Sequence, residues 1–194
     1  MKFPITGAAF VLLLLPGGAR SEAEPRVLTK VTPLPVALSD DFEFRKVKLY
    51  FLGEKAPKLR ASRATSLSPG AYSDTTARRA VVSQDSSISF ERQYRLFGAV
   101  TRLDQQQRFG DYLDFFWRTR RPADVTVRLE YRQERLHDHI QAQEISYSNV
   151  RGTHKTEFKV IGDDYLDDGR VTAWRCVLIE NGRVVAERRS FMWD

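Results

Sequence analysis

The C-terminal end of the chain carries the local pattern that constrains the fold most. Two strand-like runs, residues 171–180 and 183–193, flank the pair Asn181-Gly182. An Asn-Gly pair between two such runs is typical of a type I′ turn, whose two central residues need positive φ angles. The sequence therefore predicts an antiparallel β-hairpin at this end of the chain.

Further strand signals recur at short spacing. Residues 42–51 alternate and are rich in aromatic and β-branched side chains, and residues 125–131 place apolar and polar side chains on opposite faces. Residues 88–101, 112–118 and 154–160 give similar signals. Because no helical period separates these runs, we expect about eight strands and an all-β fold, an antiparallel β-sandwich rather than an α/β fold.

Three segments give weaker signals. Residues 24–41 contain three prolines and no sustained period, which is typical of an extended lead-in. Residues 54–85 indicate a long loop, which either hides a short edge strand or is functional or mobile. Residues 133–147 are ambiguous: Leu136, Ile140 and Gln143 fit a helical spacing, whereas residues 141–147 fit a strand with a bulge, and the flanking strands favour the strand.

The first 23 residues have the layout of a secretory signal peptide. Lys2 precedes a short apolar stretch, the breakers Pro16-Gly17-Gly18 follow, and Ser21 and Ala23 occupy the positions that a signal peptidase reads. We expect cleavage after Ala23 and export to the periplasm or the extracellular space. No cysteine follows the signal, which argues against a lipid anchor. No later apolar run reaches the length of about 18 residues that a membrane span needs.

The remaining 171 residues suffice for one domain, which we place at residues 42–194. The mature chain carries a net charge of +5, with basic pairs such as Arg78-Arg79 scattered among acidic residues. Such a distribution does not build the continuous basic stripe that nucleic acid needs. We interpret the basic balance as a source of solubility, with weak attraction to anionic envelope polymers as a minor alternative.

Cys176 is the only cysteine, so no intramolecular disulfide can hold the domain together. It lies in an apolar run, where a small buried hydrophobe is the simpler interpretation and a nucleophile would need a base that the sequence does not identify. The domain must therefore depend on its core. We expect that core to contain Trp117, Leu129, Phe158, Trp174, Cys176 and Leu178.

The segment around Cys176 resembles a strand of immunoglobulin-like domains. In those domains an acidic turn precedes a strand with an aromatic residue two positions before a cysteine, as Asp167-Asp168-Gly169 precedes Trp174-Arg175-Cys176 here. Trp117 matches the place of their core tryptophan. This chain lacks the second cysteine of the inter-sheet disulfide, and Trp174 replaces the usual corner tyrosine. Fibronectin type III-like and other exported bacterial sandwich modules also lack that disulfide, so the resemblance concerns the architecture.

Sandwiches of this kind host adhesion, carbohydrate binding, chaperoning and spacing between domains. Ser190 and the other serines lack a nucleophile elbow, and no Gly-rich phosphate loop occurs. Asp114 and Glu130 could pair in a glycosidase, but acidic residues are plentiful. We therefore expect a non-enzymatic module with a protein-interaction or structural role, where a partner could add a strand to an exposed edge. A secreted hydrolase is the third hypothesis.

A carbohydrate-binding module is the second hypothesis. Aromatic residues cluster in the strand expected over residues 112–118, and alternate members must face away from the core. Tyr112 and Phe116 are the candidates for stacking on sugar rings. The simpler interpretation is that the loop over residues 54–85 or a helix covers them, because large uncovered apolar patches are rare on monomers.

Four carboxylates stand close together in one predicted loop, and oxygen ligands at loop positions suit calcium. The spacing does not match the calcium-binding helix-loop-helix pattern, and Asp and Gly are ordinary turn formers. We favour the turn, expect no resident cofactor, and keep calcium as the leading metal hypothesis. The candidate ligands are Asp163, Asp164, Asp167 and Asp168.

A zinc site is a weaker hypothesis. His137 and His139 share a face if their segment is a strand, and His154 begins another predicted strand. Asp138 or Glu144 could support such ligands. We favour solvated surface histidines, because nothing in the sequence places His154 beside the other two.

Overall fold

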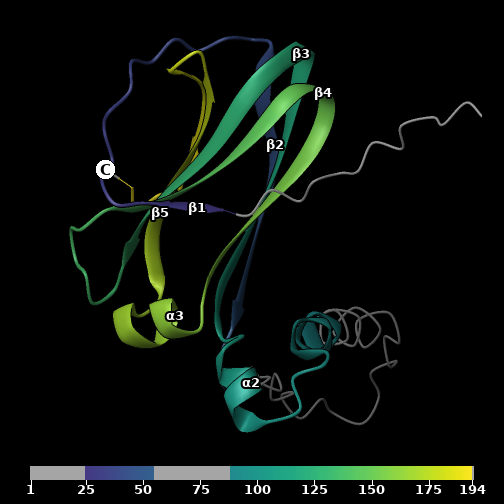
Figure 1. The fold of residues 1–194 in the computed structure, drawn as a ribbon, viewed down its shortest axis with the longest axis vertical. Helices are drawn as coiled ribbons and strands as arrows, with labels where there is room; N and C mark the ends of the chain where they lie inside the picture. The colour runs from purple at the N-terminus through teal and green to yellow at the C-terminus, as the bar shows by residue number, and fades with distance from the viewer. Residues whose placement is uncertain (1–24, 55–87, 194) are drawn as a thin grey trace, which may run out of the picture.

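The computed structural model describes residues 25–54 and 88–193 (Figure 1). The predicted signal peptide and nearly all of the predicted long loop lie outside the described residues. The described part is mostly antiparallel β-sheet, as expected. Its strands are β1 (Arg26–Leu28), β2 (Phe42–Leu52), β3 (Gly110–Gln133), β4 (Gln141–Ile161), β5 (Val171–Glu180) and β6 (Arg183–Arg189).

All six strands form one open sheet with β3 at its centre. The order is β1-β4-β3-β5-β6, and β2 pairs with β3 outside this path. β4 follows one side of β3 along most of its length. On the other side, β2 pairs with residues 110–119 of β3 and β5 with residues 126–133. The expected number of about eight strands is wrong for the described residues. The expected strands 112–118 and 125–131 both belong to β3, those expected within 133–147 and over 154–160 both belong to β4, and the one expected over 88–101 is helical, whereas β1 was not expected.

The long strands β3 and β4 bend between their halves. Their register shifts around Pro122, between Thr119 and Val125, because proline has no N–H for the ladder. The bend brings Phe115 of one half against Trp174 of β5, which pairs with the other half, at a ring-centroid distance of 5.3 Å. Pro122 would ordinarily interrupt a strand, but β3 continues through it.

The main core lies on one face of this bent sheet. Trp117 and Cys176 are completely buried, and Trp117 Nε1 donates a hydrogen bond of 2.8 Å to Thr156 Oγ1. Burial raises the pKa of the Cys176 thiol well above its ordinary value. The predicted core is confirmed, since the main cluster includes Trp117, Leu129, Phe158, Trp174, Cys176 and Leu178. We call the opposite side of the sheet the outer face.

The predicted C-terminal hairpin is confirmed. β5 and β6 pair from Glu180 and Arg183 onward, and the φ angles of Asn181 and Gly182 are 51° and 73°. Both values lie in the left-handed region that a type I′ turn requires.

The lead-in is more ordered than an extended tail. β1 pairs with residues 142–144 of β4, and Val36 forms a parallel bridge with Val184 of β6. Between these points the Thr32 carbonyl accepts a hydrogen bond from Arg128, and Leu34 packs on a small apolar cluster of β5 and β6. The segment thus crosses part of the outer face and joins two edges of the sheet.

The strand expected over residues 88–101 is wrong. Residues 88–96 are helical, and α2 (Arg102–Gln106) follows with a capping box in which Thr101 and Asp104 satisfy each other's backbone N–H groups. The acidic segment predicted as a turn is a short helix, α3 (Asp163–Asp168). Residues 134–140 form turns and a loop, and the strand predicted over residues 141–147 is confirmed as the start of β4. Figure 1 shows the helices gathered at one end of the sheet.

Candidate interaction surfaces

Large apolar side chains point to solvent from the helix over residues 88–96, the turn that follows it, and α2. Their exposed fractions run from 64% to 87%, and the Phe90 and Tyr94 rings stack at 6.5 Å. Contiguous exposed apolar side chains mark interaction sites in soluble proteins. We call this region the 88–103 apolar surface; its members are Phe90, Tyr94, Phe97, Val100 and Leu103.

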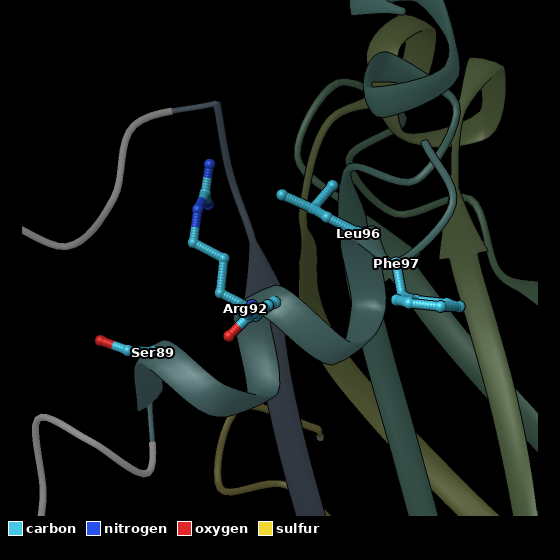
Figure 2. A pocket seen from close by; sticks show the side chains of 5 residues that line it. Ser89, Arg92, Leu96 and Phe97 are labelled. Atoms are coloured by element: carbon cyan, nitrogen blue, oxygen red, sulfur yellow. The ribbon is translucent and has the colours of Figure 1, made fainter. Parts of the chain in front are cut away.

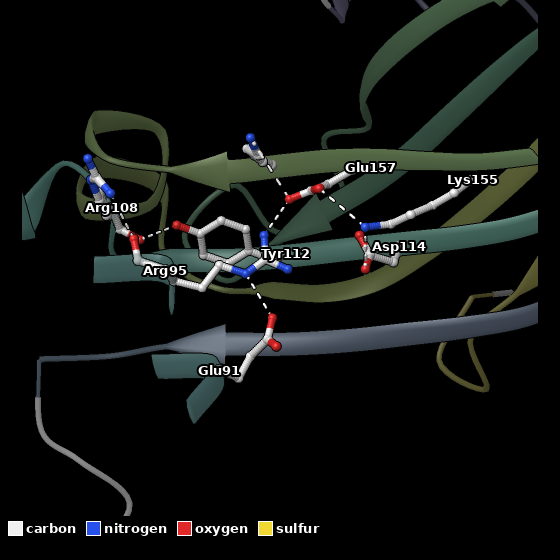
Figure 3. A network of polar contacts seen from close by, with 8 residues as sticks. Glu91, Arg95, Arg108, Tyr112, Asp114, Lys155 and Glu157 are labelled. Atoms are coloured by element: carbon white, nitrogen blue, oxygen red, sulfur yellow. Dashed lines mark hydrogen bonds and ion pairs between the residues drawn. The ribbon is translucent and has the colours of Figure 1, made fainter. Parts of the chain in front are cut away.

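A polar network fixes this helix to the outer face of the sheet (Figure 3). The Arg95 guanidinium donates to Glu91 at 2.9 Å and to Glu157 of β4, and it lies 4.2 Å from the centroid of the Tyr112 ring. Leu96 packs on a second apolar cluster that contains Tyr112. The helix therefore rests on both polar and apolar contacts.

Two more arginines fix the same helix, Arg108 at its C-terminal end and Arg92 from its middle. Arg108 donates to the carbonyl oxygens of Arg95 at 3.0 Å and Phe97 at 2.6 Å. Arg92 donates to the carbonyl oxygens of Gly53 and Glu54, at the end of β2. These bonds satisfy carbonyl groups that have no backbone partner at the end of a helix or a strand. They hold the helix in place on the sheet, and with it the exposed aromatic rings that the helix carries.

The charges of the network shift the pKa of Glu157. Burial alone would raise that pKa, but the hydrogen bond and the charge of Arg95, with the charges of Lys159 and Lys155, hold it below its ordinary value. Lys155 in turn pairs with Asp114 of β3 at 2.9 Å. Glu157 is therefore ionised at neutral pH and links β4 to the helix.

A shallow, open hollow of about 380 Å³ lies beside the apolar surface (Figure 2). It is lined by four residues of the helix and by the residue that follows the helix: Ser89, Arg92, Gln93, Leu96 and Phe97. This lining offers apolar contact and one guanidinium that is already bonded to backbone carbonyls. The hollow extends the contact surface and does not enclose a ligand.

The two predicted sugar-stacking residues, Tyr112 and Phe116, differ in how accessible their rings are. Tyr112 is only 4% exposed, because Arg95 lies over its ring and its hydroxyl donates to the Arg108 carbonyl at 2.7 Å. A sugar ring could stack on Tyr112 only if the helix moved away. Phe116 is half-buried on the outer face, with Lys48 Nζ 5.7 Å from its ring centroid. A helix thus covers Tyr112 and leaves Phe116 accessible.

The two carboxylates considered for a glycosidase pair lie on either side of the bend in β3. Asp114 pairs with Lys155, whereas Glu130 lies 3.5 Å from Arg175 and 3.7 Å from Arg128. Burial raises the pKa of Glu130, and the two arginines oppose that rise. Each carboxylate belongs to its own ion-pair network, so the structure does not bring the two together.

The four aspartates of the calcium hypothesis lie on α3 and its end. Burial and the neighbouring aspartates raise the pKa of Asp164. Protein donors hold the backbone of this segment, since Gln133 donates to two carbonyls and Arg135 to two more. Among the described residues, no group of three or more His, Cys, Asp or Glu side chains is arranged to hold a metal ion. Calcium binding stays an untested hypothesis, as does the expectation that the chain has no resident cofactor.

The three histidines occupy two different environments. His137 lies in the turn after β3 with a φ of 51°, and His139 follows in the same loop. His154 on β4 lies against Trp117, with ring centroids 4.9 Å apart. His154 therefore packs beside an aromatic residue of the main core, and the zinc hypothesis gains no support from this arrangement.

Sequence reasoning missed the 88–103 apolar surface, although two signals for its helices are present. Glu91 and Arg95 have the i, i+4 spacing of a helical ion pair, and Thr101-x-x-Asp104 has the spacing of a capping box. Both were outweighed by the alternation of Ile88 and Phe90, which face solvent and take no part in a sheet.

Comparison with protein-family models, with curated proteins and with solved structures finds no match in any of the three. Within the described residues, no helix is both long and apolar enough to cross a membrane. The site must therefore be interpreted from its own chemistry.

Proposed function

We propose that this chain is an exported, non-catalytic binding module that docks on a protein partner through the 88–103 apolar surface. The observation that carries the proposal is the exposure of five large apolar side chains, each at least 64% exposed, within 14 consecutive residues. The predicted signal peptide supports export. A structural role in the envelope or outside the cell would use the same contact.

The chemistry of the surface favours a protein over a small molecule. Aromatic side chains supply most hot spots of protein interfaces, and here Phe90, Tyr94 and Phe97 provide three of them. Small ligands are usually bound in concave pockets that enclose most of their area, whereas the hollow beside Phe97 is shallow and open. Arg102, with a side chain 81% exposed, supplies a polar rim.

The same proposal includes the finer architecture. We infer that the bent sheet packs as two layers, as in a β-sandwich, with β2 in one layer and β5 and β6 in the other. The contact between Phe115 and Trp174 supports this arrangement, because it joins the two halves through the core. The immunoglobulin-like resemblance is retained as a proposal about these two layers.

A pair of matched substitutions tests the function. Phe97→Asp places a charge in the apolar surface, and Phe191→Asp does the same at a side chain that is 96% exposed near the C-terminus. Affinity capture from the native envelope fraction is run with the unchanged chain and both variants. We expect a partner that is retained by the unchanged chain and by Phe191→Asp and is lost with Phe97→Asp. Equal capture by both variants would refute the proposed surface.

A further inference from the structure

A second surface lies on the outer face of β2, β3 and β4, beside the docked helix. Lys46, Phe116 and Lys155 stand opposite one another in register on the three strands, so their side chains share this face. Lys48 is the next residue after Lys46 on the same face of β2, and Arg118 is the next residue after Phe116 on the same face of β3. An aromatic ring is thus surrounded by four cations.

The cations of this face are accessible. Lys46, Lys48, Arg118 and Lys155 are all exposed. No carboxylate of the described residues forms an ion pair with Lys46, Lys48 or Arg118.

Three carboxylates share this face. Asp114 is 8% exposed and the Glu157 side chain 26% exposed, and both pair with Lys155, at 2.9 Å and 3.4 Å. Glu43 stands opposite Arg118 in register, with a side chain 41% exposed. Lys159 adds a fifth cation to the face, so the five cations outnumber the three carboxylates and the net charge of the face is positive.

Lysine is concentrated here in a chain that otherwise uses arginine. The sequence has eight lysines, and four of them, Lys46, Lys48, Lys155 and Lys159, lie on this face. Several arginines elsewhere bond to carboxylates or carbonyls, and Arg121 does so in the fork-shaped manner, with two nitrogens on Glu180 at 2.7 Å. Lysine presents a compact, mobile charge that suits single, spaced carboxylates.

Protection of strand edges does not account for the whole arrangement. β2 lies at an edge of the sheet, and lysines on such strands oppose unwanted pairing. Phe116, however, lies on the central strand, where a solvent-facing aromatic ring does nothing to protect an edge. Its half-buried ring, with Lys48 Nζ 5.7 Å from the ring centroid, offers an apolar surface for stacking, and lysines lie on the strands on both sides of it.

We propose that this face, which we call the lysine face, binds an acidic polysaccharide. The carboxylate or sulfate groups of the polymer pair with Lys46 and Lys48, which have no carboxylate partner among the described residues, and one sugar ring stacks on Phe116. This inference does not rest on the 88–103 apolar surface; it extends the carbohydrate hypothesis to a charged ligand and replaces Tyr112 by lysines. Nucleic acid is the weaker occupant, because lysines rather than planar arginine forks dominate the face and because the chain is predicted to be exported.

Binding of an alginate-derived oligouronate to the purified chain, measured by calorimetry at low and moderate salt, tests the proposal. Neutral dextran, a single-stranded oligonucleotide of equal charge and vesicles with anionic lipid are measured in parallel. The variants are Lys46→Gln with Lys48→Gln, Phe116→Leu, and the charge-matched control Arg188→Gln with Arg189→Gln on exposed residues of β6. Thermal unfolding of each variant verifies that it folds.

We expect the oligouronate to bind more tightly at low salt, since the contacts are exposed charges. The lysine pair variant should bind about tenfold more weakly and Phe116→Leu about threefold more weakly, while the arginine control changes binding by less than about twofold. Absence of oligouronate binding, or equal weakening in the arginine control, would overturn the proposal. Equal or tighter binding of dextran, the oligonucleotide or the vesicles would overturn it as well.

Discussion

Replacing Arg95 with methionine should release the helix over residues 88–96 from the sheet. The Arg95 side chain is only 10% exposed, and it joins Glu157 of β4 to the helix while lying over Tyr112. Methionine retains part of the apolar stem and removes the charge and every hydrogen bond. The change therefore isolates the polar contribution to docking of the helix.

The expected cost follows from the contacts. A hydrogen bond to a charged group contributes about 1.5–3 kcal/mol, and the guanidinium over an aromatic ring about 0.5–1 kcal/mol. The pair with Glu91 adds only about 0.3–0.5 kcal/mol, because Glu91 is more exposed. Allowing for non-additivity, we expect the free energy of opening this helix to fall by about 2–3 kcal/mol, or roughly 30- to 150-fold in the opening equilibrium.

Hydrogen–deuterium exchange of the amides over residues 88–96 measures this equilibrium directly. Arg102→Met is the matched control. Arg102 lies on the adjacent α2, its side chain is 81% exposed, and it pairs with Glu54 at 3.3 Å. We expect faster exchange in Arg95→Met and little change in the control. Unchanged exchange in Arg95→Met, or an equal effect in both variants, would refute the assigned role of Arg95.

Three further outcomes follow from the core and its charges. Trp174→Ala should lower the free energy of unfolding by about 3–5 kcal/mol in denaturant titration, because it removes the ring that contacts Phe115 across the bend; a loss below about 1 kcal/mol would contradict this packing. Cys176 should react with a small alkylating reagent only after denaturation, since it is completely buried; rapid labelling of the folded chain would show that the site opens. Glu157→Gln should lower the thermal midpoint at pH 7: the folded carboxyl has a lowered pKa, so its stabilisation is present above the unfolded value of 4.5 and is lost as the pH falls through the folded value. A difference between the two proteins that grows on acidification would contradict that sign.

The hairpin and the first long strand could be predicted because local chemistry decides them. Asn181-Gly182 supplies the two positive φ angles by itself, and the alternation of β2 matches a strand with one face on the core. Burial of Trp117 and Cys176 likewise follows from apolar runs in strands. No distant contact is needed to recognise any of these features.

The docking of the helix over residues 88–96 on the sheet and the bend of β3 depend on distant contacts instead. Arg95 is held by Glu157, a partner 62 positions away, and such a pairing has no local signal. Pro122 indicates the end of a strand, yet β3 continues past it with a shift of register. Next to the shift, the backbone N–H of Arg120 donates to the Asp41 carbonyl at 2.9 Å. The candidate surface was missed for the same reason: its exposure follows from how the helix docks, and the sequence shows only its apolar residues.

Site-specific photo-crosslinking in the native cell tests the central claim, that the 88–103 apolar surface contacts a protein partner. A photoreactive residue replaces Tyr94 in one variant and Phe191 in the other, two side chains that are 64% and 96% exposed. We predict a discrete crosslinked protein species from position 94 that is absent from position 191. Crosslinking from both positions to the same species, or none from position 94 while the chain is folded and exported, would contradict the account.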